Sequence, residues 1–441
     1  MAVADTQLAN RILIGLIVGA VAGALVLVIG AFVPVVLEWA RALSTTLLDP
    51  FGQVFLRLLF FVVIPLIFAS LAVGVVQLGR LSDLGPLAGR TFVLFALNMG
   101  IAVALGLIMM NVLNPGGQLD DLTRTELIAE YGGAAQSAIE RQAQSPGMNL
   151  NTLVDMFMPR NLFGAFVGND RNLLGEVLPL ILFAILVGAA GTQLAPEKRA
   201  KVQYSLEVLT ELMIGIVHFA LRLAPYAVPA LIFSVVVKIG FGIIVALGLF
   251  VVGCALVMAL HLFGTFSIWL KVWTRRSPRQ FFRDIRPILI TAFSTSSSNA
   301  TLPTSLAVSR ETLGIRPTTA GFVLPLGATM NMSGTALYEG CVVLFVAQVF
   351  GVDLSFTQQL MLLMLAVLSA VAVAGIPGGS LPLIAGLLIT FGIPPEGIGI
   401  VLGADRLLDM MRTVVNVGAD VVACAVVDER TQLSTEPAQP G

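Results

Sequence analysis

Long apolar runs separated by short polar stretches follow one another along most of this 441-residue chain. A helix needs about 20 mostly apolar residues to cross a bilayer. By this measure we predict six spans before residue 275, at 12–37, 47–78, 91–113, in interrupted pieces over 157–194, at 206–223 and at 228–271. No run shows the alternation of polar and apolar residues that a membrane β-strand requires. The pattern therefore predicts an all-α polytopic membrane protein.

Composition supports this class and excludes others. Hydrophobic residues make up 57% of the chain and charged residues 12%, which is about half of the charged share of a soluble domain. A net charge of −1 argues against a nucleic-acid partner. Cys254, Cys341 and Cys424 lie far apart within apolar segments, so we expect buried thiols and neither a disulfide nor a metal site.

The charges of the predicted loops indicate how the chain is oriented. Basic residues gather at Arg80 and Arg90, in 198–201 and in 275–286, whereas the loop over 117–150 is acidic. Because basic loops tend to stay on the cytoplasmic side, we place the chain in the cell inner membrane or plasma membrane with both termini in the cytoplasm. No small-residue cleavage site follows the first apolar run, so we interpret it as a spanning helix rather than a removed signal.

Polar residues interrupt the apolar runs of the last third of the chain. The stretch 287–308 has a centre rich in serine and threonine, and 360–391 has glycine and proline in its middle. Both patterns predict re-entrant helical hairpins whose turns line a cavity. The sequence GATMNMSGT lies in the middle of 317–350 and predicts a broken seventh span. We divide the chain into five regions. Two scaffold spans occupy 1–90, the third and fourth spans with the acidic loop occupy 91–200, and the fifth and sixth spans occupy 201–274. A transport core over 275–430 and a flexible cytoplasmic tail over 431–441 follow.

The last apolar stretch, 397–427, predicts an eighth span and keeps ionisable residues in its interior. The polar residues are spaced so that they line one stripe of a helix, and they are Asp409, Arg412, Thr413, Asn416 and Asp420. A charge near the bilayer centre costs about 2.5 to 3.5 kcal/mol by insertion measurements, so such residues face a protein interior or a cavity. Asp409 and Arg412 alone could form a structural pair, but that would leave Asn416 and Asp420 unexplained. Together with the broken helices, the stripe predicts a transporter core.

Four stretches, SSSNATLP at 296–303, NMSGT at 331–335, AGIPG at 374–378 and DMMRTVVN at 409–416, resemble the signature motifs of the dicarboxylate/amino acid:cation symporters. This family includes the glutamate and aspartate transporters. The resemblance implies a homotrimer whose protomers have eight transmembrane helices and two re-entrant hairpins, with an elevator-type transport domain that slides against a scaffold. It also implies that the chain is not an enzyme and that it carries an acidic amino acid, L-aspartate or L-glutamate, together with sodium ions.

The resemblance assigns roles in substrate binding to individual residues. Arg412 would bind the side-chain carboxylate of the substrate and Asp409 its α-amino group, as suits a guanidinium and a carboxylate. Hydrogen bonds would come from Thr335, Thr413 and Asn416. The backbone at the two hairpin tips would hold the α-carboxylate, through Ser296, Ser297 and Ser298 on the first hairpin and Gly379 and Ser380 on the second. The serines could instead form a packing surface between helices.

The resemblance further implies two sodium sites built from hard oxygen ligands, with no other cofactor. The first ion would lie among the carbonyl oxygens of Gly327, Asn331 and Asn416 and the carboxylate of Asp420. The second would lie beside Met332, between Thr329 and backbone carbonyls of the second hairpin at about Ala370, Val371 and Val373.

A third cation site of the family does not fit this sequence. Ser333 stands where sodium-coupled members commonly have aspartate, and Phe95, Asn98 and Met99 stand where they have tyrosine, threonine and serine. Sodium binds a thioether poorly, and a buried cation without a carboxylate is costly. We therefore expect fewer than three sodium ions per substrate, most simply two, with a proton as a stand-in. We expect Asn98 to donate a hydrogen bond to Ser333 or Asn331.

Three alternatives remain open. Symport of a C4-dicarboxylate or coupling to protons would keep the same family, although Asp409 would repel a dianion that has no amine. An intramembrane serine hydrolase would need a base beside the serine cluster, and nothing in the sequence pairs His218 or His261 with it. An anion channel would need a continuous polar pore, and the first six spans offer little beyond Arg57 and Asn98.

Overall fold

The computed structural model describes residues 2–78, 86–119, 158, 161–163, 177–372 and 380–433. All regular secondary structure in these residues is helical. Seven of the described helices, or runs of consecutive helices, are long and apolar enough to cross a membrane. The described part of the chain therefore has the all-helical architecture of a multi-pass membrane protein, as its hydropathy predicts.

The first two predicted spans differ in their bounds from the observed helices. Helix α1 (Ala2–Phe32) ends before Pro34, which begins α2 (Pro34–Leu43), so the first span does not continue to residue 37. The second span begins with α2 and runs through the π-helical η1 (Ser44–Leu48), α3 (Asp49–Phe60) and α4 (Val63–Leu78). Pro65 does not interrupt a continuous helix, because α3 has already ended and Pro65 lies in the first turn of α4, where a missing N–H has no helical partner to lose.

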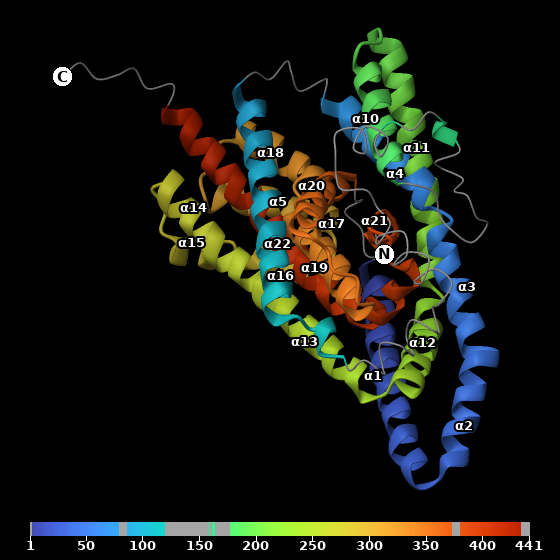
Figure 1. Ribbon diagram of the computed structural model, residues 1–441. Coiled ribbons are helices and arrows are strands. Elements are labelled where there is room, and N and C mark those ends of the chain that lie inside the picture. Colours follow the sequence, from blue (N-terminus) through green and yellow to red (C-terminus); the bar gives the residue numbers. More distant parts are fainter. Residues whose placement is uncertain are drawn as a thin grey trace, which may run out of the picture.

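The middle of the chain requires a second correction. Helix α5 (Pro86–Leu113) is the third span, and it is followed by α10 (Val177–Thr192), α11 (Pro196–Leu221) and α12 (Ala224–Ile239). The predicted sixth span, 228–271, is not one element, because Gly240 has a φ of 95° and ends α12. Helix α13 (Phe241–Ala259), the π-helical η4 (Leu260–Thr265) and α14 (Phe266–Trp273) then follow. The residues predicted for the fifth span, 206–223, lie mostly in α11, and α11 and α12 lie end to end in Figure 1.

The last third contains the predicted interruptions. Helices α16 (Arg286–Thr295) and α17 (Ser298–Glu311) are joined by a two-residue turn, and α18 (Pro317–Met330) and α19 (Ser333–Val349) are separated at Asn331 and Met332. Helices α20 (Phe356–Ala372) and α21 (Leu381–Thr390) flank 373–379, which lies outside the described residues. Helix α22 (Ile398–Leu433) is the charged span, and it enters the predicted flexible tail, 431–441, because its last three residues are helical. The short α15 (Pro278–Asp284) precedes α16.

Helix α22 lies at the centre of the molecule. It contacts α16, α18 and α19, and α5 packs along α19 and also contacts α22. A peripheral group forms one edge of the molecule in Figure 1, where α12 packs against α1 and α3, and α10 and α11 pack against α4. Burial follows this arrangement, since 94% of the apolar window of the α18–α19 span is buried but only 22% of that of α1. The polar interruptions are therefore in the interior and the uniformly apolar helices are outside.

Candidate functional site

Two aspartates and two arginines form a buried cluster on α22. Arg412 donates from Nε to Asp409 Oδ1 at 2.8 Å, and its Nη1 lies 3.4 Å from Asp405 Oδ1. Arg406 Nη1 lies 3.3 Å from the other oxygen of Asp409. The exposed fraction of Arg412 is only 2%. The structure therefore brings Arg412 and Asp409 together and adds a second pair of opposite charges.

The added pair, Asp405 and Arg406, is missing from the sequence prediction. Asp405 is four residues before Asp409 and seven before Arg412, so its position on the predicted stripe follows from the same helical spacing. Tyr338 of α19 completes the surroundings, because the Arg412 guanidinium carbon lies 4.7 Å from the centre of its ring. The guanidinium is therefore held on one side by carboxylates and on another by an aromatic face.

Asn416 links the charged helix to the break between α18 and α19. Its Oδ1 accepts hydrogen bonds from the backbone N–H of Gly334 at 2.7 Å and of Thr335 at 3.3 Å. Its Nδ2 donates to Thr335 Oγ1 at 3.1 Å. These amides begin α19 and have no partner within the helix, so Asn416 caps α19 from a neighbouring element. Gly334 is required there because a side chain would overlap the Arg412 carbonyl oxygen.

Thr413 is placed beside Asp409 by its own helix. Its hydroxyl donates to the Asp409 carbonyl oxygen at 2.8 Å, so its oxygen lone pairs remain the part that can accept a hydrogen bond from a substrate ammonium. Thr413, Thr335 and Asn416 are all buried. Thr413 thus contacts the charged cluster, and Thr335 and Asn416 contact each other.

Two of the residues predicted for the first ion, Gly327 and Asn331, lie beside Asp420. Asn331 Nδ2 donates to Asp420 Oδ1 at 3.0 Å, and the same carboxylate lies so close to the Gly327 α-carbon that no side chain would fit there. Asn98 Nδ2 donates to Asn331 Oδ1 at 3.0 Å, which confirms the predicted hydrogen bond between these two residues. Asp420 and Asn331 are 3% and 0% exposed. The carboxylate is therefore buried and is held by an amide.

The residues predicted for the second ion differ from one another in burial and in hydrogen bonding. The Met332 sulfur accepts hydrogen bonds from Thr335 Oγ1 at 3.9 Å and Asn416 Nδ2 at 3.7 Å. Thr329 is exposed, and its hydroxyl donates to the Leu326 carbonyl oxygen at 3.0 Å. Ala370 and Val371 lie in the last turn of α20, where carbonyl groups run out of helical partners. Val373 lies outside the described residues.

The tip of the first hairpin is a tight turn of serines. Ser296 has a φ of 49° and ends α16, and Ser297 begins α17 with its Oγ accepting from the Ala300 N–H at 3.2 Å. Ser298 is buried in the first turn of α17. Both helices pack against α22. On the second hairpin Ser380 is buried before α21, and Gly379 lies outside the described residues.

The residues that stand at the family's third cation site are buried in the described part of the structure. Phe95, Met99 and Ser333 are all buried, and the Ser333 hydroxyl makes no hydrogen bond to the described part of the chain. Asn98 uses its amide group for Asn331 instead.

Glu339 is a further buried ionisable residue that the sequence analysis overlooked. It lies on α19 with an exposed fraction of 0%, and neither carboxyl oxygen makes a hydrogen bond to the described residues. Its polar neighbours include the Ser369 hydroxyl of α20 and the positive charge of Arg412 on α22. A signal was available, because Glu339 is the single charged residue in the sequence between Arg316 and Asp353.

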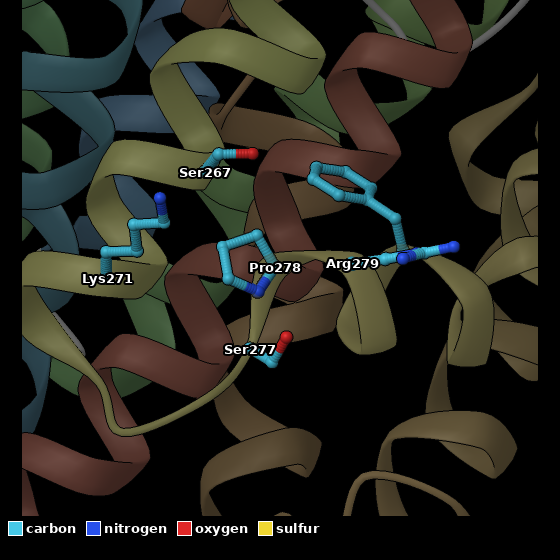
Figure 2. Close-up of a pocket in the computed structure, with 6 residues that line it drawn as sticks. Ser267, Lys271, Ser277, Pro278 and Arg279 are labelled. Atoms are coloured by element: carbon cyan, nitrogen blue, oxygen red, sulfur yellow. The ribbon is translucent and has the colours of Figure 1, made fainter.

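A separate hollow of about 390 Å³ lies between the end of α14 and α15. Figure 2 shows Lys271 and Arg279 on opposite sides of Pro278 at this hollow. Its remaining lining residues are Ser267, Ser277 and Phe282. None of the predicted substrate or sodium ligands lines it, so it is distinct from the site on α22.

Comparison with known proteins agrees with this geometry. A sequence model described as the sodium:dicarboxylate symporter family matches residues 8–430. The chain is 30% identical to a proton/sodium-glutamate symport protein of Bacillus subtilis over 96% of this chain and 92% of that protein. It is 30% identical to a proton/glutamate-aspartate symporter of Escherichia coli, with 87% and 85% covered. It is also 30% identical to C4-dicarboxylate transport protein 1 of Mesorhizobium japonicum, with 86% and 76% covered.

The family consists of transporters and is not a class of enzymes, which confirms the prediction that the chain is not an enzyme. The match covers both the peripheral helices and the core that carries the charged cluster. The chain belongs to the sodium:dicarboxylate symporter family.

Proposed function

We propose that this protein is a secondary active symporter that moves an acidic amino acid, L-aspartate or L-glutamate, together with fewer than three sodium ions, most simply two. The buried Arg412 beside Asp409 is the observation that carries the substrate assignment. A guanidinium can bind the side-chain carboxylate of the substrate in a bidentate manner, and an aspartate three residues earlier can bind its ammonium group. Arg412 and Asp409 also lie within ion-pair distance of each other, so neither charge stands alone in the buried site.

The backbone breaks support a role in ion and substrate binding. At Asn331 and Met332 the chain leaves helical geometry inside a buried span, and at Ser296 and Ser297 it turns between two helices. Such interruptions are tolerated at membrane depth where they line a cavity. In the proposed protein the two hairpins are re-entrant, the chain has eight spans, and the core over 275–430 moves as an elevator against the scaffold of a homotrimer. The protomers lie in the cell inner membrane or plasma membrane with both termini in the cytoplasm.

Substrate class can be tested by competition. Aspartate uptake into proteoliposomes with an inward sodium gradient should be inhibited by unlabelled glutamate or aspartate and hardly by succinate. Asp409 provides the reason, since a second carboxylate would face a dianion that brings no ammonium. Strong competition by succinate would instead favour the C4-dicarboxylate activity for which one of the relatives is named.

Ion coupling can be tested by varying one gradient at a time. We expect uptake with a sodium gradient and none with a proton gradient alone, because Asp420 supplies a carboxylate for a cation within a set of oxygen ligands. Accumulation above the external concentration distinguishes this symport from a channel, which would only equilibrate the labelled substrate. Equal uptake with a proton gradient and no sodium would refute the sodium assignment.

Glu339 favours a second candidate, in which a proton accompanies the substrate. An ionised carboxylate at this position would lack a hydrogen-bond partner among the described residues, whereas a protonated carboxyl is neutral and costs less to bury. Relatives named for proton symport are consistent with this candidate. Glu339→Gln should then abolish substrate-dependent acidification of proteoliposomes while sodium-dependent exchange of aspartate continues. Acidification that survives in this variant would exclude Glu339 as the proton carrier.

A further inference from the structure

A chain of buried hydrogen bonds connects Asp420 to residues that lie outside the candidate site. It begins at His261 of η4, whose Nε2 lies 3.1 Å from Asn98 Oδ1 on α5. It continues through the bonds from Asn98 to Asn331 and from Asn331 to Asp420, each 3.0 Å long. The exposed fractions of His261 and Asn98 are 0% and 1%, so these two residues are buried as fully as Asn331 and Asp420. We refer to His261, Asn98, Asn331 and Asp420 as the relay.

The charge on Asp420 determines the direction of every bond in the relay. A carboxylate only accepts hydrogen bonds, so Asn331 must turn its Nδ2 toward Asp420 and its Oδ1 toward Asn98. Asn98 must then present Nδ2 to Asn331 and Oδ1 to His261. The imidazole must consequently carry a proton on Nε2. Each side chain therefore donates toward the carboxylate, and each depends on the one before it for its orientation.

His261 is itself fixed on three sides. Its Nδ1 lies 3.2 Å from Thr265 Oγ1, and its ring meets the edge of Phe266 with the ring centres 4.7 Å apart. Both His261 and Thr265 belong to the π-helical segment η4, which interrupts the helix between α13 and α14. π-Helical turns are rare in proteins, and those that do occur are often found at functional sites. The segment holds the imidazole against Asn98 rather than toward lipid.

The inner end of the relay acts on the broken backbone. Asn331 and Met332 have non-helical backbone angles between α18 and α19, and the Asn331 side chain is hydrogen bonded at both of its polar atoms. Side chains that orient metal ligands from behind typically change metal affinity about 10- to 100-fold when they are removed. The relay has this position relative to Asn331 and Asp420, two of the proposed sodium ligands.

We propose that His261 is a positioning residue for sodium: through Asn98 it fixes the Asn331 amide and the Asp420 carboxylate and thereby sets the affinity of the first cation site. This inference rests on the proposed sodium coupling. Loss of the imidazole leaves Asn98 Oδ1 buried without a donor, so that Asn98 and Asn331 are free to reorient. Substrate binding at Arg412 does not involve the relay and should be unaffected once sodium is saturating.

The test compares three variants with the wild-type protein in proteoliposomes. His261→Phe keeps the ring and its packing but removes both nitrogens, and it should raise the sodium concentration for half-maximal uptake roughly 10- to 100-fold. The KM for aspartate at saturating sodium should remain that of the wild type. His261→Gln can still donate to Asn98 and should restore most of the sodium affinity. His218→Phe is the matched control, since His218 is exposed on α11 and should behave as the wild type.

A second readout does not depend on transport. Sodium without substrate should raise the Tm of the purified wild-type protein, because an ion that binds only the folded state stabilises it. The sodium concentration needed for this rise should increase in His261→Phe and not in His218→Phe. Where His261→Phe does not yield folded protein, Asn98→Leu removes the next link and should show the same separation between sodium and aspartate.

The outcomes separate this inference from the function on which it rests. If Asp420→Asn raises the sodium requirement and His261→Phe does not, the relay has no role and only the inference fails. If Asp420→Asn also leaves the sodium requirement unchanged, the proposed sodium site is wrong and the inference fails with it. A purely structural role would lower the apparent affinity for sodium and aspartate alike, or would leave His261→Gln as defective as His261→Phe, and either result overturns the proposal.

Discussion

Asp49 at the start of α3 and Arg412 in α22 are both charged residues within apolar segments, but their surroundings differ. Lys238 Nζ of α12 lies 2.6 Å from one oxygen of Asp49, and the Ser234 hydroxyl donates to the other at 2.5 Å. Arg412 shares its guanidinium between Asp409 and Asp405, both on its own helix. The pair at Asp49 therefore joins two helices of the peripheral group, whereas the ion pairs of Arg412 and Arg406 all lie within α22.

This difference shows how a functional charge can be told from a structural one. An ion pair that connects two elements contributes to packing, and Asp49 has a donor at each oxygen. Four buried charges on one helix cost desolvation energy, and their ion pairs do not connect that helix to another element. Burial of that kind is expected where a ligand supplies the remaining interactions. The comparison thus favours a structural role for Asp49 and Lys238 and supports the proposed role of the cluster in substrate binding.

Replacing Arg412 is the strongest test of this comparison. Arg412→Cys should abolish aspartate uptake, because breaking a buried ion pair costs about 3 to 5 kcal/mol, which corresponds to a loss of affinity on the order of 100-fold or more. We expect this variant to admit neutral amino acids by exchange, which a panel of labelled substrates would measure. Lys238→Met is the control, and it should lower the Tm of the protein while leaving the KM for aspartate unchanged. Aspartate affinity that survives in Arg412→Cys would remove the basis of the substrate assignment.

Asp420 should show a smaller and more selective effect. Asp420→Asn keeps the shape of the side chain and its hydrogen bond with Asn331 but removes the only formal charge among the proposed ligands of the first ion. A hydrogen-bonded charged group contributes about 1.5 to 3 kcal/mol, so the sodium concentration for half-maximal uptake should rise roughly 10- to 100-fold. Aspartate binding at saturating sodium should change less. A variant in which the aspartate KM rises and the sodium requirement does not would place Asp420 in the substrate site instead.

The sequence predicted those parts of the molecule in which polar residues interrupt an apolar run. The break at Asn331 and Met332 and the turn at Ser296 and Ser297 follow from such interruptions, because uncharged polar residues in mid-span must face the interior. The boundary at Gly240 was missed, since apolar residues continue on both sides of it and hydropathy alone does not mark a turn.

Contacts between residues that are far apart in sequence could not be predicted from the sequence. His261 and Asn98 are 163 residues apart, and no periodicity pairs them. Their contact depends on how α5 and η4 pack, and the orientation of His261 depends on a π-helical segment that residue type does not predict. Glu339 could have been identified as an isolated charge in an apolar span, but its lack of hydrogen-bond partners is a property of the packed structure.

Replacing Ser333 should have the smallest effect of these substitutions. It tests whether a third sodium ion is bound in addition to the two proposed. Ser333, Phe95 and Met99 are all buried, Phe95 and Met99 offer no hard oxygen ligand, and Asn98 has its amide group committed to Asn331. A carboxylate introduced alone would therefore be buried without a cation, which is costly. Ser333→Asp should leave the number of sodium ions per substrate below three, as measured from reversal potentials in proteoliposomes under opposed sodium and aspartate gradients. The triple variant that also carries Asn98→Thr and Met99→Ser supplies the missing oxygens, so only there should the number rise. A value near three in the wild-type protein, or a rise in Ser333→Asp alone, would show that another oxygen already completes the third site.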